Sequence, residues 1–223
     1  MILIVKVEKG QSRNVYIWAP DLTERMHNGQ SKQVKGPVYL SGLHSSGKTI
    51  AVLDEKNHYL DFGIPGEEVA FVSLRKRHGF RHGEVSDVVF SSPSRINPKC
   101  IHHRHCNSCS WQHIEYSQQL RMKHQILQQA LVKYGIDAPP VPDVKPSAET
   151  WNYRHRVEYT FSSHAIADTS STYGLGFHRS GEPGEVVDIK ECFLQKEPSR
   201  QICDFIRHFA EGAHLSAKCL MKS

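Results

Sequence analysis

The sequence predicts two domains: a small closed β-barrel of the OB type, followed by an α+β domain that contains a metal-binding cluster of cysteines. Three observations support this division. Residues 36–97 hold short β-rich runs separated by turn residues, three cysteines follow within residues 98–112, and residues 98–223 mix helical and strand patterns. Residues 1–35 precede the barrel as an extension of unclear structure.

The charge of the chain is concentrated in one segment. The 223 residues carry 28 Lys and Arg against 23 Asp and Glu, a net charge of +5, and 39% are hydrophobic. The residues from Arg75 to Cys106 include seven basic and two acidic side chains, which accounts for the whole excess. Such a segment favours a surface that binds a polyanion, although a solvated basic loop explains the charge equally well.

No segment of the sequence resembles a membrane span or a targeting signal. No apolar run approaches the ~20 residues that a spanning helix needs. The apolar start, Met1 to Val5, lacks the longer core of a signal peptide. We therefore expect a cytoplasmic, monomeric protein with neither a membrane nor DNA as a partner.

Five runs rich in β-forming residues fill the first domain. They are Val38–Leu40, Ile50–Leu53, Tyr59–Phe62, Glu68–Ser73 and Gly83–Val89. Turn signals such as Ser45-Ser46-Gly47 and Ile64-Pro65-Gly66 separate them. Five short strands in this length fit a Greek-key barrel, a fold that often binds nucleic acids.

Gly42–Thr49 matches the P-loop pattern G-x4-G-K-[ST] residue for residue. A P-loop lies between a strand and a long helix, whereas a β-rich run and turn residues follow this one. We interpret the match as a β-turn, and a P-loop nucleotide-binding protein remains the less favoured alternative function.

The second domain is predicted to mix helices and strands. A helix spans roughly Glu115 to Tyr134 and ends at Gly135, and a stiff linker, Ala138–Pro142, follows. The apolar face of this helix is expected to hold Tyr116, Leu120, Leu127, Leu131 and Tyr134. Strands are expected at Val157–Phe161, Tyr173–His178 and Glu185–Ile189. A last helix near Pro198–Phe209 places Ile202, Phe205, Ile206 and Phe209 on one face, as expected for a stripe that packs on the core.

The cysteines carry the clearest chemical signal. Cys100, Cys106 and Cys109 have the spacing C-x5-C-x2-C, and Cys192 is the obvious fourth ligand. Two interpretations fit, a four-Cys iron–sulfur cluster or a structural zinc. One His among His102, His103, His105 and His113 could complete a three-Cys zinc site. Unligated thiols are the less favoured alternative. Cys203 is expected in the core, and Cys219 is not interpreted.

Basic side chains interleaved with aromatic ones predict contacts to RNA. Lys and Arg neutralise phosphates, and aromatic rings stack on bases. The first group links two expected barrel strands around Phe80, and consists of Arg75, Lys76, Arg77 and Arg81. The second group is predicted to contact a folded RNA loop, and consists of Arg154, Arg156, Phe177 and Arg179. The alternative is a solvated face with ordinary core aromatics.

Together these blocks resemble the RNA uracil-5-methyltransferase family, specifically its large-subunit ribosomal RNA branch, from about Gly36 to Phe209. The resemblance rests on Gly42, Gly47-Lys48, Ile64–Glu67, Ser94–Cys100, Cys106–His113, Tyr116, Gln119-Leu120, Lys123, Tyr153–Arg156, Phe161, Leu175–Arg179 and Asp188–Gln195. It implies that the barrel is a TRAM domain and that Cys100, Cys106, Cys109 and Cys192 hold a [4Fe–4S] cluster. The family usually has two glycines where this chain has Asn107 and Ser108, and Asn tolerates a left-handed backbone better than most residues.

The family's chemistry belongs to a C-terminal Rossmann-like domain that binds S-adenosylmethionine. There a cysteine adds to C6 of uracil, C5 takes the methyl group, and a base removes the C5 proton. This sequence shows no Gly-rich cofactor loop after a strand and no Asp-Pro-Pro-Arg-like block. We therefore assign no catalytic and no S-adenosylmethionine-binding residue. The resemblance implies the RNA-recognition portion of a 23S rRNA uracil-C5-methyltransferase, inactive by itself. A zinc-stabilised RNA-binding module without enzymatic lineage is the main alternative.

Overall fold

The computed structural model describes residues 34–77, 79–137, 139–162, 165–166, 174–180 and 182–213. The chain divides into two compact units. The first combines Met1–Ile96 with His113–Val144, and the second combines Asn97–Gln112 with Lys145–Ser223. The observed boundary after Ile96 lies within one residue of the expected one, but His113–Val144, expected in the second domain, belongs to the first unit. In the part of the chain that is described, no helix has the length and apolar character to cross a bilayer.

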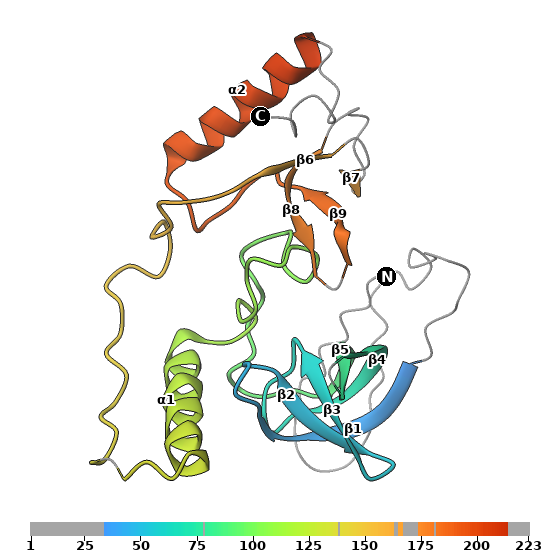
Figure 1. The fold of residues 1–223 in the computed structure, drawn as a ribbon, viewed down its shortest axis with the longest axis vertical. Coiled ribbons are helices and arrows are strands. Elements are labelled where there is room, and N and C mark those ends of the chain that lie inside the picture. The colour runs from blue at the N-terminus through green and yellow to red at the C-terminus, as the bar shows by residue number, and fades with distance from the viewer. Residues whose placement is uncertain are drawn as a thin grey trace, which may run out of the picture. The chain divides into compact units, whose positions relative to one another are not determined.

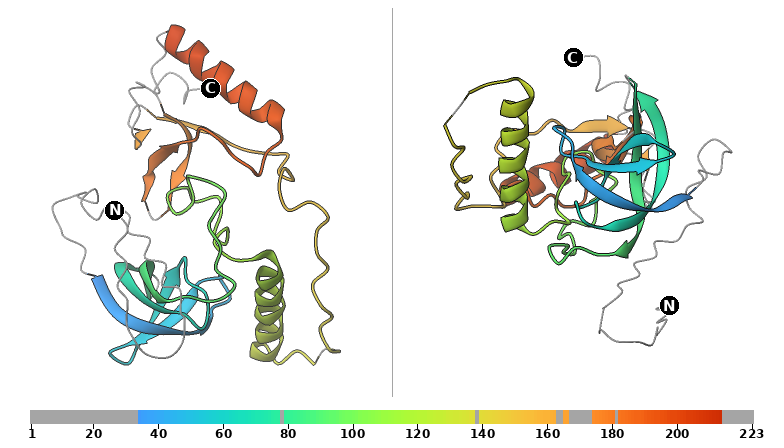
Figure 2. Two further views of the ribbon diagram at one scale, coloured as in Figure 1. Left: turned by 180° about the vertical axis from the view of Figure 1, so that it is seen from behind. Right: turned by 90° about the horizontal axis from the view of Figure 1, so that it is seen from below.

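The first unit is built on a closed five-stranded barrel (Figures 1 and 2). Its strands are β1 (Val34–Leu43), β2 (Thr49–Leu53), β3 (Lys56–Asp61), β4 (Glu68–Arg77) and β5 (Phe80–Phe90). The order around the barrel is β1-β2-β3-β5-β4, and the β3–β5 pair is parallel. Alternate side chains fill the interior, including the fully buried Leu40, Leu60 and Phe71. The predicted barrel and all five predicted strands are confirmed, with their ends shifted by a few residues.

The P-loop-like residues form a β-hairpin. Leu43 pairs with Thr49 across the β1–β2 turn, and β2 follows where a P-loop would have a helix. The Lys48 ammonium pairs with Asp61, and the buried Thr49 hydroxyl donates to the Leu60 carbonyl at 3.1 Å. Both side chains that would bind phosphate and magnesium therefore stabilise the barrel, which agrees with the β-turn interpretation.

A buried carboxylate joins two sequence blocks that lie far apart in the chain. Glu67 is completely buried, and its two oxygens accept from Arg95 Nε and Nη2, both at 2.6 Å. The backbone N–H groups of Ile64 and Ser92 donate to the same carboxylate at 2.9 and 3.1 Å. The bidentate pair fixes the segment that leaves β5 against the loop before β4.

Replacing Arg95 with Met is expected to lower the free energy of unfolding by about 3 kcal/mol, because it leaves the Glu67 charge buried without its cation. The measurement is the urea midpoint of unfolding. The control is Arg121→Met, since Arg121 lies exposed on a helix and bonds only Gln118 among the contacts described. Equal midpoints for the two variants would show that the Glu67–Arg95 pair does not stabilise the barrel.

The helix α1 (Tyr116–Lys133) completes the first unit. Its bounds agree with the prediction, and Gly135 ends it in the left-handed region at φ 61°. The predicted apolar face is wrong, because Leu127 and Tyr134 are exposed and Met122 is the buried side chain of the helix. The helix is mostly solvated, and therefore its pattern of apolar residues does not report a core-facing stripe.

The second unit holds a four-stranded sheet and one helix (Figure 1). The strands are β6 (Thr160–Ser162), β7 (Ala165–Ile166), β8 (Gly174–Arg179) and β9 (Glu182–Asp188), in the order β6-β8-β9-β7. The predicted β8–β9 hairpin is confirmed, and β7, parallel to β9, has no counterpart in the prediction. The helix α2 (Glu197–Gly212) follows the loop after β9.

The orientation of α2 is the opposite of the predicted one. The side chains expected to pack on the core are exposed: Ile202, Phe205, Ile206 and Phe209. The buried face consists of Cys203, Arg207 and Ala210. Burial of Cys203 agrees with the prediction, but the reason for the reversal is a charge. Arg207 is 7% exposed and pairs with the fully buried Asp188 at 3.0 Å, so the basic side chain points inward.

Candidate functional site

Hydrogen bonds, most of them from the backbone, hold the cysteine loop of residues 100–109 against the rest of the second unit. Its own turns are closed by bonds such as Cys106 N–H to the His102 carbonyl at 2.9 Å. Two bonds then join it to the β8 hairpin, from Asn107 N–H to the His178 carbonyl and from Ser180 N–H to the His105 carbonyl. A third runs from Lys190 N–H to His102 Nε2 at 3.1 Å. These bonds bring the loop to the chain segment that carries Cys192.

All four predicted ligands line one cavity. We call it the cysteine cavity; its lining residues are Cys100, His102, His103, Cys106, Ser108, Cys109, Gln112, Phe177, Ile189, Glu191, Cys192, Phe193 and Leu194. Cys106 is buried and packs in one hydrophobic cluster with Cys192, Phe177 and Ile189. All four thiols are free of disulfides. The structure therefore brings together residues that are separated by up to 92 positions in the sequence.

The cavity is electrostatically suited to a cation. Burial raises the pKa of the Cys100, Cys106 and Cys109 thiols, and the neighbouring cysteines raise it further. Two hydrogen bonds act in the opposite direction and favour the thiolates: Ser108 N–H donates to Cys106 Sγ at 3.4 Å, and the Gln112 side chain lowers the pKa of Cys109. Raised pKa values favour the neutral thiols, so these side chains would become thiolates together only with a positive charge bound between them.

The positions of the histidines bear on the predicted zinc site. Among the described residues, no three His, Cys, Asp or Glu side chains are grouped as ligands of a single metal ion. His113 is buried in the first unit, where its Nε2 lies 3.4 Å from the Gly63 carbonyl and its ring contacts Phe62. His102 and His103 line the cavity, whereas His105 and His113 do not. A zinc site completed by His113 is therefore not supported.

The loop between Cys106 and Cys109 does not need glycine. Positive φ angles occur at Arg104 and at several other described positions, but Asn107 and Ser108 are not among them. The two non-glycine residues therefore adopt ordinary backbone conformations, and the Asn107 N–H is used to bind β8. The departure from the family's sequence leaves the loop intact.

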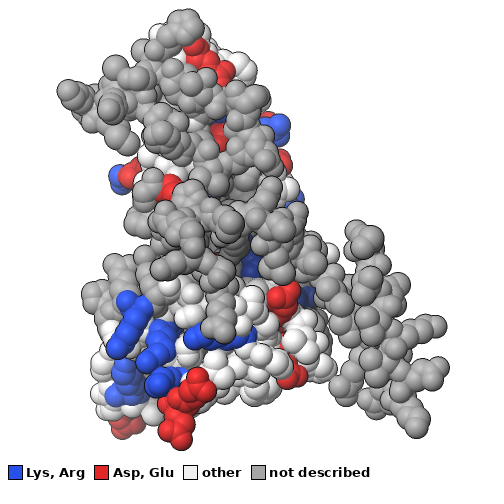
Figure 3. Space-filling view, turned by 90° about the vertical axis from the view of Figure 1, so that its right-hand side faces the viewer, with Lys and Arg blue, Asp and Glu red and all other residues white. Residues whose placement is uncertain are grey.

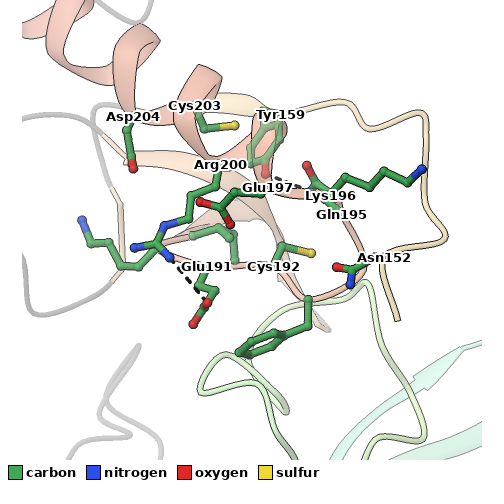
Figure 4. A pocket seen from close by; sticks show the side chains of 13 residues that line it. Asn152, Tyr159, Glu191, Cys192, Gln195, Lys196, Glu197, Arg200, Cys203 and Asp204 are labelled. Atoms are coloured by element: carbon green, nitrogen blue, oxygen red, sulfur yellow. Dashed lines mark hydrogen bonds and ion pairs between the residues drawn. The ribbon is translucent and has the colours of Figure 1, made fainter. Parts of the chain in front are cut away.

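Cys203 lies in a different pocket, next to α2 (Figure 4). This pocket also contains Cys192, and Tyr159 lies beside Cys203 with its hydroxyl accepting from Gln195 Nε2 at 2.9 Å. Burial and the neighbouring Cys203 thiol raise the pKa of Tyr159 well above its usual value. Cys203 does not line the cysteine cavity. Cys219 lies outside the described residues.

Three of the four RNA-contact residues predicted in the second unit line one groove. We call it the Arg154 groove; it is formed by Asn107, Ser108, Arg154, Arg156, Val157, Glu158, Thr160, Phe177 and His178. Arg156 is exposed and pairs with Glu158 at 2.9 Å. Phe177 is only 8% exposed and stacks on Tyr159 at 4.8 Å, so it forms the floor of the groove. Arg179 pairs instead with Glu185 at 3.3 Å.

The Arg154 groove and the cysteine cavity share a wall. Ser108 and Phe177 line both. The Arg154 charge acts on the Cys106 and Cys109 thiols, lowering pKa values that burial has raised. A ligand that contacts Arg154 from the groove therefore lies next to the candidate metal centre.

The basic residues predicted on the barrel lie at the β4–β5 hairpin. Arg75 pairs in register with His82, Lys76 with Arg81, and Arg77 with Phe80. Figure 3 shows Lys and Arg side chains gathered on one face of this unit. Burial lowers the pKa of His58, and the nearby Lys35 and Arg81 lower it further, which indicates a positive potential on this side.

A cluster of aromatic side chains lies beside this hairpin, and it was not predicted from the sequence. Phe80 lies 5.1 Å from Tyr59 and 5.9 Å from His44, and Tyr59 lies 6.4 Å from His82. Phe80 is 43% exposed, which leaves its ring accessible for stacking. The group depends on the parallel β3–β5 pairing, which places Tyr59 opposite His82, and no local signal in the sequence predicts that pairing.

The chain is similar to RNA methyltransferases over most of its length. An uncharacterised RNA methyltransferase of Porphyromonas gingivalis is 32% identical over 183 residues, which cover 76% of this chain and 39% of that protein. A protein of Legionella pneumophila named 23S rRNA (uracil(1939)-C(5))-methyltransferase RlmD is 31% identical over 150 residues, which cover 67% of this chain and 33% of that protein. This chain belongs to the RNA uracil-C5-methyltransferase family.

A solved structure agrees in fold with this member of the RNA uracil-C5-methyltransferase family. The Pyrococcus abyssi tRNA (uracil-54, C5)-methyltransferase, solved with S-adenosyl-L-homocysteine, matches 81% of this chain and 38% of its own length, with a TM-score of 0.55 and 24% identity. No family model matches the chain. The chain therefore spans well under half the length of each of these three relatives.

Proposed function

We propose that this chain is the RNA-recognition and iron–sulfur portion of an S-adenosylmethionine-dependent 23S rRNA uracil-C5-methyltransferase. The observation that carries the proposal is the convergence of Cys100, Cys106, Cys109 and Cys192 on one cavity that shares a wall with the basic Arg154 groove. In this proposal the barrel serves as a TRAM-type RNA-binding domain. The methyl donor is bound by the part of the relatives that this chain does not match, and the chain alone transfers no methyl group.

We infer a [4Fe–4S] cluster rather than zinc because the four cysteines are spread around one cavity. One zinc ion requires every sulfur at ~2.3 Å from a single point, and the described residues hold no such group. In a cluster each thiolate binds a different iron, so the cysteines can line a cavity without meeting at one point. The cluster would supply the positive charge that buried thiolates need and would tie the loop of residues 100–109 to Cys192. It takes no part in any step that we assign.

RNA recognition is supported by two surfaces of different character. On the barrel, Lys76 and Arg81 are cross-strand neighbours in the hairpin that also carries the exposed Phe80, so one hairpin offers cations for phosphates and a ring for a base. In the second unit, Arg154 and Arg156 border a groove with the polar side chains Thr160 and His178. Single-stranded loops of RNA present both unstacked bases and phosphates, which makes them the substrate that these surfaces fit.

Reversing the charge at Arg154 and Arg156 to Glu is expected to weaken binding of a single-stranded rRNA fragment at low salt by at least about tenfold. It should also lower the slope of log affinity against log salt by about 0.7 for each phosphate that the protein no longer neutralises. The measurement is a filter-binding titration at several salt concentrations, with iron content as the check that the cysteine cavity is intact. The control Arg121→Glu reverses an exposed charge on α1 and should change affinity little. Unchanged affinity in the double variant would refute the groove's role in RNA binding.

A further inference from the structure

The outer face of α2 is a stripe of large apolar side chains without a partner among the described residues. Ile202, Phe205, Ile206 and Phe209 are 56%, 71%, 37% and 60% exposed. The rings of Phe205 and Phe209 stack with centroids 6.5 Å apart, so they form one continuous surface, which we call the α2 stripe. Large apolar residues grouped on one exposed face mark an interaction site, whereas single exposed ones are ordinary.

The helix cannot bury this stripe by rotating, because polar contacts hold its inner face. Arg207 Nη2 donates to Asp188 Oδ1 at 3.0 Å and to the Ile189 carbonyl at 3.1 Å. Figure 4 shows Cys203 and Asp204 turned to the pocket beneath the helix. Rotation would move the Arg207 charge to the outside and leave the fully buried Asp188 without it, at a cost that apolar burial does not offset. The stripe is therefore fixed as an outward surface.

The size of the α2 stripe distinguishes between possible occupants. A stable symmetric dimer buries about 800 Å² per partner. A phenylalanine offers only about 150–250 Å², so four partly exposed side chains on one helix fall well short. The stripe is large enough for an interface between two domains of one chain. Such interfaces are commonly smaller or more polar than obligate interfaces between subunits. The relatives contain such a candidate, because 61% of the Porphyromonas gingivalis protein and 62% of the Pyrococcus abyssi chain lie outside the region that this chain matches (100% minus 39% and 38%).

We propose that the α2 stripe is the docking surface for the methyl-donor-binding part of uracil-C5-methyltransferases. The inference rests on the proposed function, which places the donor site in the part of the relatives that this chain does not match. Phe205 and Phe209 are the central contacts, and Ile202 and Ile206 border them. The rigid Arg207 anchor would transmit the position of that part to β9 and to the segment carrying Cys192.

The test uses the full chain and the unmatched portion of the Porphyromonas gingivalis relative as a separate polypeptide that has been verified to bind S-adenosylmethionine. Hydrogen exchange of residues 197–212 is measured without RNA while this polypeptide is titrated. Slower exchange over α2 is expected. Phe205→Glu combined with Phe209→Glu should weaken the effect at least tenfold, as judged by the concentration at half-maximal protection. The matched control, Leu127→Glu combined with Val132→Glu, alters two exposed apolar side chains of α1 and should leave the effect unchanged.

Two results would overturn the inference. One is unchanged exchange over α2 at every concentration of the S-adenosylmethionine-binding polypeptide. The other is protection that depends only on the concentration of this chain, which would assign the stripe to a second copy. Because no RNA is present in this experiment, unchanged RNA affinity in the Arg154 and Arg156 variant would count against the proposed function and leave this result standing.

Discussion

Replacing Cys106 with Ser is expected to abolish the iron–sulfur centre that we propose for this chain. After anaerobic purification the unaltered protein should be brown and contain about four iron atoms and four acid-labile sulfides per chain. The variant should lose about nine-tenths or more of both, because Cys106 is the most buried of the four thiols and packs directly with Cys192 and Phe177. The second unit should also unfold at lower temperature, since metal binding and folding are coupled at such sites.

The chain supplies a matched control for this experiment. Cys203 is as well buried as Cys106, at 8% against 9% exposure, but it lies on α2 outside the cysteine cavity. Cys203→Ser should therefore keep its iron and sulfide. A colourless protein with one zinc per chain would instead support the zinc-stabilised module. Iron retained in the Cys106 variant would contradict the four-cysteine assignment altogether.

Replacing Arg207 with Met should destabilise the second unit by about 3–5 kcal/mol, because it leaves Asp188 charged and completely buried. Asp188 accepts from Leu175 N–H at 3.1 Å and pairs with Lys190 at 2.5 Å as well as with Arg207. Burial alone would raise the pKa of Asp188. Lys190, the Leu175 N–H and Arg207 reverse that effect and hold the pKa below the usual value. The stability this provides is present above the ordinary aspartate pKa and is lost as the pH falls below it.

Urea unfolding followed by tryptophan fluorescence, to which Trp111 and Trp151 of the second unit contribute, measures this effect. Arg200→Met is the control, since the Arg200–Glu191 pair at 3.6 Å is half-exposed and should contribute less than about 1 kcal/mol. Adding Asp188→Asn to Arg207→Met should recover part of the loss, because it removes the buried charge that has lost one of its two cations. If the Arg207 and Arg200 variants unfolded at the same urea concentration, the buried pair would not be the anchor of α2.

Much of the fold could be predicted because its signals are local. Each barrel strand is a short β-rich run with turn residues at both ends, and α1 begins and ends within one residue of the expected positions. The closure of the barrel was predicted from the number of strands. Two other features were not predicted, because each joins residues more than 20 positions apart: the parallel pairing of β3 with β5, and the Glu67–Arg95 pair.

The candidate site was predicted unevenly. The cysteine spacing predicts three ligands locally, and Cys192 was predicted as the fourth. All four line one cavity, and their binding of a metal stays a prediction. The contacts that surround the site could not be predicted from the sequence. Nothing in the sequence places Phe177 under the Arg154 groove or Tyr59 beside Phe80, since those contacts arise only when separate strands pair.

The sequence by itself determined which residues form strands and helices and which thiols are candidates for a metal, since both depend on short spacings along the chain. Only the tertiary structure decided which way α2 faces. The apolar residues of the α2 stripe favour an orientation that buries them, whereas Arg207 is buried only in the opposite orientation. No property of the helix alone decides between the two. The fully buried carboxylate of Asp188, 19 positions earlier, decides the orientation. Its attraction for the Arg207 guanidinium holds that side chain inward, which leaves four apolar side chains in water.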